Sequence, residues 1–385
     1  MLIIAPAREA LAGNYGKNKN IMFGFGKNKF LGIDIGTSTI KIVEIEMSSS
    51  KPTLSNYAWM KVGNLGDIKF SSFDSTLPLY LKKVIKEGGF KSREAYVSIP
   101  ASGGLITLIE FPEMTREDLD QAIRFEAHKY IPASMEDVVL SWDIVNKKTG
   151  NHLLKKSGEE AGVKGDAAEP GDKIQVLLVA APKNKVAKYE QLIKNSDLDL
   201  KSIEVESFAL LRSLVGNDQG DFVVVDIGAR VCNIILIEKG VIKVNRNIDA
   251  GGRDITRAIA RSMNIDEERA EKMKMSGKDF LAKESNINFP SLDLIISEVR
   301  RVLGAFYKND GGSRVDGVIL SGGTAGLAGI DKYFSDALGM RAIIGNPLRR
   351  VEYDAVFEPK LNEIKSQLSV SIGLALKGAE EYLRK

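Results

Sequence analysis

Two stretches of the sequence decide the fold: FLGIDIGTSTIKIVEI at Phe30–Ile45 and FVVVDIGARVCNIILI at Phe222–Ile237. In each, apolar residues flank a glycine-containing turn, which predicts a strand, a tight turn and a second strand. Each carries Asp-Ile-Gly before the turn, and Asp34 and Asp226 are 226 − 34 = 192 residues apart. One such tripeptide is a weak signal, but two copies in equivalent settings indicate a duplicated fold.

The residue types in these turns suit the binding of a polyphosphate. Glycine at a tight turn lets successive backbone N–H groups point into one concavity, where phosphate oxygens fit. An aspartate at a strand end can hold a magnesium ion, usually through its waters. For one motif alone, an aspartate that merely caps a turn explains the pattern equally well. For the pair, we predict two hairpins that hold a phosphate chain between them.

A third segment completes the set. The sequence GVILSGGT at residues 317–324 predicts a buried strand that ends in two glycines. Glycines in that position allow a flat adenine to approach the backbone closely. Alone this is a common strand–helix turn, but its place after the two hairpins makes it specific.

Composition excludes several functional classes. The chain has 385 residues, enough for two to four structural units, and 54 basic against 51 acidic residues give a net charge of +3. No global field therefore favours nucleic acid or an anionic membrane as partner. A single cysteine, Cys232, excludes an internal disulfide, and two histidines, His128 and His152, are too few for a His-rich metal site. No apolar run has the length of a membrane helix, so a cytoplasmic protein is expected.

Four segments outside these motifs carry further expectations. Residues 1–21 form a poor signal peptide, and Met22 is an alternative start. Thr115 is predicted to open a helix that ends before Pro132. The glycine-rich stretch 146–173 is predicted to be a mobile surface loop. The amphipathic helix at Leu361–Leu383 is expected to pack on the protein body, with membrane binding as the alternative.

The order of phosphate hairpin, phosphate hairpin and Gly-Gly strand end resembles the actin-like ATPase superfamily. Within it, the chain resembles the PilM family of type IV pilus assembly proteins. The resemblance covers about residue 23 to the C-terminus and is carried by FGFGKNKFLGIDIGTSTIKIVEI, LIEFPEMTREDLDQAIRFEAHKYIPASMEDVVLSWDIV, IEVESFALLRSL, DAGGRDITRAIA and SIGLALKGAEEYL. It implies an α/β fold with two related domains around a nucleotide cleft and an inserted small subdomain like that of FtsA.

The resemblance also assigns residues to ATP and Mg²⁺. The magnesium ion is expected at Asp34, Asp226 and Glu206, mostly through water. Cys232 stands where many relatives have threonine, and no residue is assigned to position the attacking water, so slow or absent hydrolysis is expected and the catalytic residues remain unassigned. The full nucleotide set comprises Asp34, Gly36, Thr37, Ser38, Thr39 and Lys41 in the first loop, Glu206, then Asp226, Gly228 and Ala229 in the second loop, Gly251 and Gly252 beneath the phosphates, Glu271 and Lys274 at the ribose, and Gly322, Gly323 and Thr324 at the adenine.

The implied domain organisation is as follows. Residues 1–27 form a flexible extension, 28–92 and 184–212 the core of the first domain, and 93–183 the inserted subdomain. Residues 213–252 and 316–372 form the core of the second domain, 253–315 its helical part, and 373–385 a C-terminal helix.

The implied role is that of an ATP-binding scaffold in the inner-membrane platform of the type IV pilus. Its expected partners are the N-terminal cytoplasmic peptide of the membrane protein PilN, other platform proteins, motor ATPases and further copies of itself. The inserted subdomain is the expected site for the peptide, because a sheet edge and a groove can hold an extended chain. The alternatives are an FtsA-like division protein, whose usual basic C-terminal membrane helix is not apparent in GLALKGAEEYLRK, and a small-molecule kinase.

Overall fold

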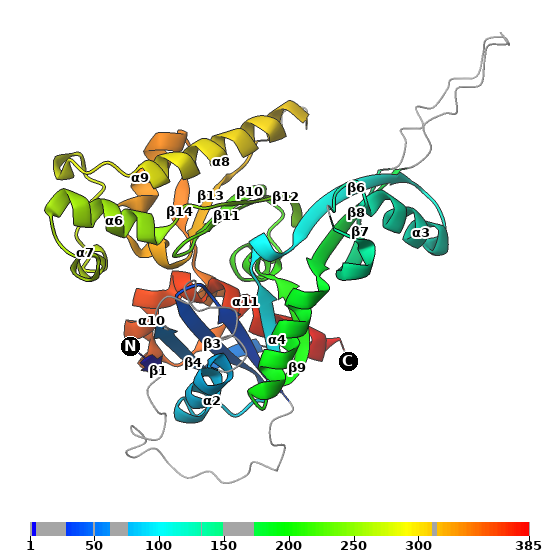
Figure 1. Ribbon diagram of the computed structural model, residues 1–385, viewed down its shortest axis with the longest axis horizontal. Coiled ribbons are helices and arrows are strands. Elements are labelled where there is room, and N and C mark those ends of the chain that lie inside the picture. Colours follow the sequence, from blue (N-terminus) through cyan, green and yellow to red (C-terminus); the bar gives the residue numbers. More distant parts are fainter. Residues whose placement is uncertain are drawn as a thin grey trace. The chain divides into compact units, whose positions relative to one another are not determined.

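The computed structural model describes residues 2–4, 28–48, 51–61, 76–131, 133–148, 173–309 and 314–384. The chain forms two units. The larger unit comprises Met1–Ser102 and Val186–Lys385, and the smaller unit comprises Gly103–Lys185. Figure 1 shows the elements of both, coloured along the sequence.

The first sheet of the larger unit is built around the first predicted hairpin. β2 pairs antiparallel with β3, β3 pairs antiparallel with β4, and on the other side β5 and β9 add in parallel. The outer edge of β4 is partly covered by β1 and β15. The strands, in sheet order, are β1 (Leu2–Ile4), β4 (Lys51–Lys61), β3 (Thr39–Ser48), β2 (Lys29–Ile35), β5 (Glu94–Ile99) and β9 (Asp199–Val205), with β15 (Glu352–Tyr353) beside β4.

The second sheet repeats this plan around the second hairpin. β10 and β11 form the antiparallel hairpin, β12 continues it, and β13 and β14 add in parallel on the far side. The order β12-β11-β10-β13-β14 therefore matches β4-β3-β2-β5-β9 strand for strand, and the predicted duplication is confirmed. The strands are β10 (Phe222–Ile227), β11 (Cys232–Glu238), β12 (Val241–Ile248), β13 (Gly317–Ser321) and β14 (Ala342–Ile344).

Helices cover these two sheets (Figure 1). The second sheet shares one apolar core with α6 and α8, in which Val225, Ile255 and Leu292 are fully buried. The helices of the larger unit include these two and the C-terminal α11, described next. They are α2 (Leu77–Glu87), α4 (Lys183–Asn195, which begins in the smaller unit), α5 (Glu206–Leu210), α6 (Gly252–Met263), α7 (Glu267–Lys274), α8 (Pro290–Asn309), α9 (Ile330–Leu338), α10 (Glu358–Ile364) and α11 (Ser369–Leu383).

Helix α11 packs on the first sheet, as expected for the C-terminal segment. Ile372, Leu374 and Ala375 are fully buried. Gly32 on β2 makes the close approach possible, because a Cβ atom there would lie 1.9 Å from the carbonyl oxygen of Ser371. None of the helices in the described ranges is long and apolar enough to cross a bilayer.

The smaller unit is a three-stranded sheet with one helix. The sheet has the order β6-β8-β7 and is antiparallel throughout. As predicted, Thr115 caps the helix, and its Oγ1 accepts the N–H of Asp118 at 3.2 Å. Leu119 and Ile123 of the helix pack against Val176 and Leu178 of the central strand. The elements are β6 (Leu105–Pro112), α3 (Arg116–Ala127), β7 (Val138–Lys148) and β8 (Lys173–Pro182).

Two predicted boundaries need correction. The inserted subdomain does not begin at 93: β5 lies between β2 and β9 in the first sheet, and the smaller unit begins at Gly103. The N-terminal extension is not wholly without structure, because Leu2–Ile4 pairs with β4. Residues 5–27 and most of the predicted loop, 149–172, lie outside the described residues.

Candidate functional site

The two hairpin turns have the same hydrogen-bonded geometry. The N–H of Gly36 donates to the carbonyl oxygen of Thr39 at 2.9 Å, and the N–H of Gly228 donates to that of Val231 at 3.0 Å. The residues opposite the two aspartates also correspond: Asp34 pairs with Lys41 and Asp226 pairs with Asn233 in register. Each hairpin thus ends in an aspartate beside a glycine turn, as the sequence predicts, but only the first carries a cation opposite its aspartate.

That cation neutralises part of an acidic cluster. Lys41 Nζ lies 2.8 Å from Oδ2 of Asp34, which is 5% exposed. Burial alone would lower the pKa of Lys41, but the charges of Asp34, Asp226 and Glu206 outweigh it and raise that pKa. One ammonium group therefore stands in the field of three carboxyl groups from β2, β10 and the start of α5.

The other two carboxyl groups are hard to ionise. Burial first, and then the charge of Asp226, raises the pKa of Glu206 to about 8, although Glu206 Oε1 accepts the N–H of Ala101 at 2.9 Å. Burial and the charge of Asp34 raise the pKa of Asp226 to about 6, against the opposing effects of the Ser321 hydroxyl and Lys41. Three carboxyl groups thus share one cation in a buried site, and a further cation close to them would favour their ionised forms.

Two glycines join the second turn to helix α6. The N–H of Gly252 donates to the carbonyl oxygen of Gly228, and the N–H of Arg253 donates to that of Ala229, both at 2.9 Å. A Cβ atom at Gly251 would lie 2.8 Å from the carbonyl oxygen of Ala229. Glycine is therefore required at residue 251, and the N-terminus of α6 begins directly beside the turn.

A buried lysine links α6 to α7. Lys274 is 7% exposed, and its Nζ donates to the carbonyl oxygen of Gly252 at 3.0 Å and to Thr256 Oγ1 at 2.9 Å. It also lies 2.7 Å from Oε2 of Glu271, which accepts a short hydrogen bond from Thr256. Burial lowers the pKa of Lys274. This cluster fixes Glu271 and Lys274 beside the Gly252 turn, as the ribose assignment requires.

The Gly-Gly strand end meets the same turn. Gly322 has φ +85°, and a Cβ atom there would lie 2.6 Å from the carbonyl oxygen of Ile227. A Cβ atom at Gly252 would lie 2.7 Å from Oγ1 of Thr324. A Cβ atom at Gly323 would have only Gln367 Oε1 near it, at 3.9 Å, so this backbone borders open space.

Most of the predicted nucleotide residues are thus brought together in the larger unit. Thr37 and Ser38 lie in the first turn, but their hydroxyls make no hydrogen bond within the described ranges, and Thr37 is exposed. Among the described residues, no three acidic, histidine or cysteine side chains form a direct metal centre. Asp34, Asp226 and Glu206 carry the oxygen donors that a magnesium ion prefers.

Sequence reasoning missed several neighbours of the site. Asn233 was detectable, because it lies 192 residues after Lys41 just as Asp226 follows Asp34. Ser321 and Thr256 belong to segments already singled out. Gln367, which accepts the indole N–H of Trp59, has no local signal. Cys232 lies fully buried in the core of the second sheet, where burial raises the pKa of its thiol.

Comparison with known proteins agrees with this architecture. A family model described as type IV pilus assembly protein PilM matches residues 32–156 and 162–379. A solved PilM-PilN type IV pilus biogenesis complex contains a chain that is 26% identical, with a TM-score of 0.73, over 91% of this chain and 98% of that one.

More distant relatives are cell division proteins. FtsA of Enterococcus faecalis is 21% identical over 87% of this chain and 84% of its own length. FtsA of Enterococcus hirae is 21% identical over 81% of this chain and 76% of its own length. The duplicated sheets, the paired glycine turns and the extent of the family match lead to one conclusion: the chain has the actin-like ATPase fold and belongs to the PilM family of type IV pilus assembly proteins.

Proposed function

We propose that this protein binds ATP with Mg²⁺ between its two glycine turns and acts as a scaffold in type IV pilus assembly. The observation that carries the nucleotide proposal is the shared electrostatic cluster. Asp34, Asp226 and Glu206 converge from three elements of the larger unit on the single cation of Lys41. A magnesium ion with its water would balance this charge, and the backbone N–H groups of the turns would face the phosphates.

Each part of the site has a separate task in this proposal. Lys41 exchanges its contact with Asp34 for a phosphate oxygen when the nucleotide enters. Asp34, Asp226 and Glu206 orient the waters of the metal ion. Magnesium, when bound, supplies charge neutralisation for the phosphate chain. The Thr256–Glu271–Lys274 cluster meets the ribose, and adenine lies along Gly323.

Calorimetry with Mg-ATP tests this proposal. Asp34→Ala and Asp226→Ala should each weaken binding by at least about tenfold, the scale of one lost charge-assisted contact. Asp336→Ala is the matched control, because Asp336 is an exposed acid on α9 that pairs only with Lys332 in the described structure. Unchanged affinity in both site variants would refute the assignment.

The scaffold proposal includes a peptide partner. The PilM family membership and the likeness to a PilM-PilN complex support the N-terminal peptide of PilN as that partner. The smaller unit offers two sheet edges, because β8 is central and both β6 and β7 have one side without a strand in the described structure. An extended peptide that adds to a sheet edge gains main-chain hydrogen bonds, and side-chain pockets give specificity.

Side chains on β7 allow a test that preserves the fold. Val139 is 42% exposed and Ile144 is 38% exposed, so aspartate at both should leave the core intact. The double variant should lose pull-down of a PilN N-terminal peptide and keep Mg-ATP binding. Phe125→Asp on α3 is the control, since Phe125 is 74% exposed but lies on the helix. Deletion of residues 103–185 behind a short linker should abolish capture. Full-affinity capture by the deletion variant would place the peptide site elsewhere.

A further inference from the structure

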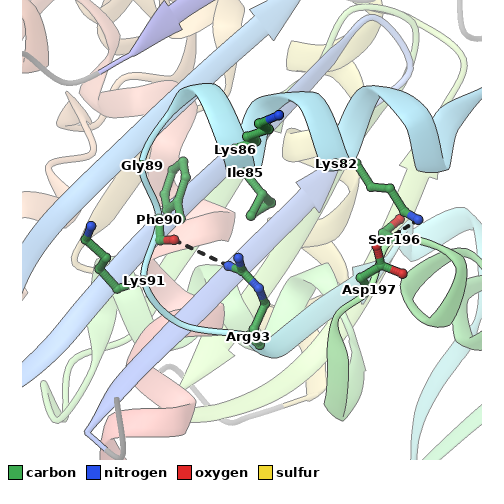
Figure 2. A pocket seen from close by; sticks show the side chains of 9 residues that line it. All are labelled: Lys82, Ile85, Lys86, Gly89, Phe90, Lys91, Arg93, Ser196 and Asp197. Atoms are coloured by element: carbon green, nitrogen blue, oxygen red, sulfur yellow. Dashed lines mark hydrogen bonds and ion pairs between the residues drawn. The ribbon is translucent and has the colours of Figure 1, made fainter. Parts of the chain in front are cut away.

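A basic pocket lies in the larger unit, built by the end of α2, the loop that leads to β5, and the turn between α4 and β9. It has a volume of about 470 Å³. Figure 2 shows its lining: Lys82, Ile85, Lys86, Gly89, Phe90, Lys91, Arg93, Ser196 and Asp197. Four of these side chains are cationic and one is anionic, so the hollow carries an excess of three positive charges.

Most of this charge is uncompensated. Lys82 Nζ lies 2.8 Å from Oδ2 of Asp197, which is the one acidic group in the lining. Lys86 and Lys91 have no ion-pair partner among the described residues. The last turn of a helix favours a cation, which accounts for Lys86. It does not account for Lys91 and Arg93, which lie beyond the helix.

Arg93 is fixed through Nη1, which leaves the Nε and Nη2 edge of its guanidinium group available for a ligand. Its Nη1 donates to the carbonyl oxygen of Phe90 at 3.3 Å and to that of Ser92 at 3.0 Å, and Figure 2 shows the guanidinium turned toward Phe90. Its Nε and Nη2 donate to no other group in the described part of the chain. That edge is the planar fork that binds phosphate or carboxylate through two parallel hydrogen bonds.

The loop that carries Lys91 and Arg93 is hydrogen-bonded to β2 and β3 of the first sheet. Glu44 is 2% exposed, and its Oε2 accepts the N–H of Lys91 at 2.7 Å and that of Ser92 at 2.8 Å. Ser92 Oγ donates to the carbonyl oxygen of Lys29 at 2.6 Å. The loop is therefore fixed before any ligand arrives, which reduces the entropy lost on binding.

This pocket is separate from the nucleotide site. Ser92 contacts Lys29 at the start of β2, whereas Asp34 lies at the other end of the same strand. The end of α11 lies at the pocket's end of the sheet, because the ring of Tyr382 is 6.0 Å from that of Phe30. Tyr382 is 41% exposed and Leu383 is 57% exposed. Exposed aromatic and apolar side chains at the same end as cations are typical of surfaces that meet a lipid interface.

We propose that this pocket binds a phosphate-bearing ligand, with Arg93 as its bidentate contact and Lys86 and Lys91 as flanking charges. A lipid headgroup and a soluble phosphate compound share this chemistry. The inference does not depend on the proposed nucleotide site, because none of its residues belongs to that site.

Two arms of one experiment distinguish the sources. In the first, the full chain is sedimented with vesicles of phosphatidylglycerol and phosphatidylcholine, and with vesicles of phosphatidylcholine alone. In the second, inositol hexakisphosphate and inorganic phosphate are titrated by calorimetry into the Asp226→Ala variant, which impairs the proposed nucleotide site and leaves the pocket intact. Binding only to the anionic vesicles identifies the headgroup, and binding of the soluble compounds identifies a free phosphate ligand.

Substitutions locate the binding in this pocket. Lys86→Glu, Lys91→Glu and Arg93→Glu should each reduce binding about fivefold or more, the scale of one cation near an anionic surface. Arg93→Lys keeps the charge but loses the fork, so a reduction there indicates bidentate contact. Asp197→Asn should strengthen binding, because it frees Lys82, and asparagine tolerates the φ of +59° at this position. Lys272→Glu with Lys332→Glu is the control, since both are exposed lysines on α7 and α9.

Three results would overturn the proposal. The first is no binding in either arm at low salt. The second is binding that the control variant reduces as much as the pocket variants do. The third is equal binding of poly-glutamate, which would show a general affinity for anions. Mg-ATP affinity should stay unchanged in every pocket variant, so failure here leaves the nucleotide proposal untouched.

Discussion

Trp59 donates its indole N–H to Oε1 of Gln367 at 2.8 Å, and the same oxygen is the atom nearest to the open side of Gly323. Trp59 belongs to β4 of the first sheet, and Gln367 lies just before α11. A ligand bound along Gly323 would therefore contact the Gln367 side chain, which is hydrogen-bonded to Trp59.

This contact predicts an optical signal for nucleotide binding. The chain has two tryptophans, and Trp142 lies in the smaller unit. In a Trp142→Phe variant, Mg-ATP should change the intensity or the wavelength of the remaining Trp59 emission, because the environment of Gln367 changes. Titration by fluorescence measures the effect, and Trp59→Phe with Trp142 intact serves as the control. A silent Trp59 at saturating Mg-ATP would place the adenine away from Gly323.

The two adjacent glycines should behave differently when substituted. Gly322→Ala forces a side chain into a positive φ and against the carbonyl oxygen of Ile227, so it should lower stability by about 1–3 kcal/mol. Gly323→Val meets no such neighbour and should keep the melting temperature while blocking adenine. Thermal unfolding and calorimetry separate the two effects. A Gly323→Val protein that binds ATP normally would contradict the adenine assignment.

The stability of the nucleotide-free protein should fall as the pH rises. Burial raises the pKa of Glu206 from 4.5 to about 8, so the folded state holds this proton more tightly than the unfolded chain does. The stabilisation is complete below pH 4.5 and is lost progressively up to about pH 8. Denaturant unfolding across this range measures it. Glu206→Gln cannot ionise and should remove the part of the slope between about pH 6 and pH 8, while the share of Asp226, whose pKa is raised to about 6, remains. An unchanged slope in Glu206→Gln would contradict the prediction.

Hydrolysis by the isolated protein should be slow. The resemblance assigns no residue to orient an attacking water, and this is one of the few tasks left once metal and loops hold the phosphates. Turnover should stay below about one per minute, comparable to unassisted nucleotide switches. A phosphate-release assay with Asp34→Ala as the background control measures it, and steady turnover well above that rate would contradict this expectation.

The sequence was sufficient for the parts of the site that depend on backbone form. The glycines at 228, 251 and 322 are required by turns and close approaches, and such requirements leave a local pattern. Asp34 and Asp226 were detectable because duplication placed them at equivalent strand ends.

The remaining parts depend on contacts between distant segments. Glu94–Ile99 and Leu105–Pro112 are similar apolar strands close together in sequence, yet they belong to different sheets. Only the pairing of β5 with β2 and β9 decides this, and pairing partners leave no local signal. The same holds for Gln367 and for the N–H of Ala101 that binds Glu206.

The smaller unit is inserted between two neighbouring strands of the first sheet, so its replacement need not disturb that sheet. The chain leaves the first sheet after β5 and returns through α4 to β9, and these two strands are direct neighbours, with Ile99 paired to Val205. The hydrogen bonds between β5 and β9 hold the two ends of the insertion together. The smaller unit therefore does not set the register of these two strands. We therefore expect that the smaller unit can be replaced without disturbing the pairing of β5 with β9, which makes grafting of a foreign segment between residues 102 and 186 a practical route to chimeras.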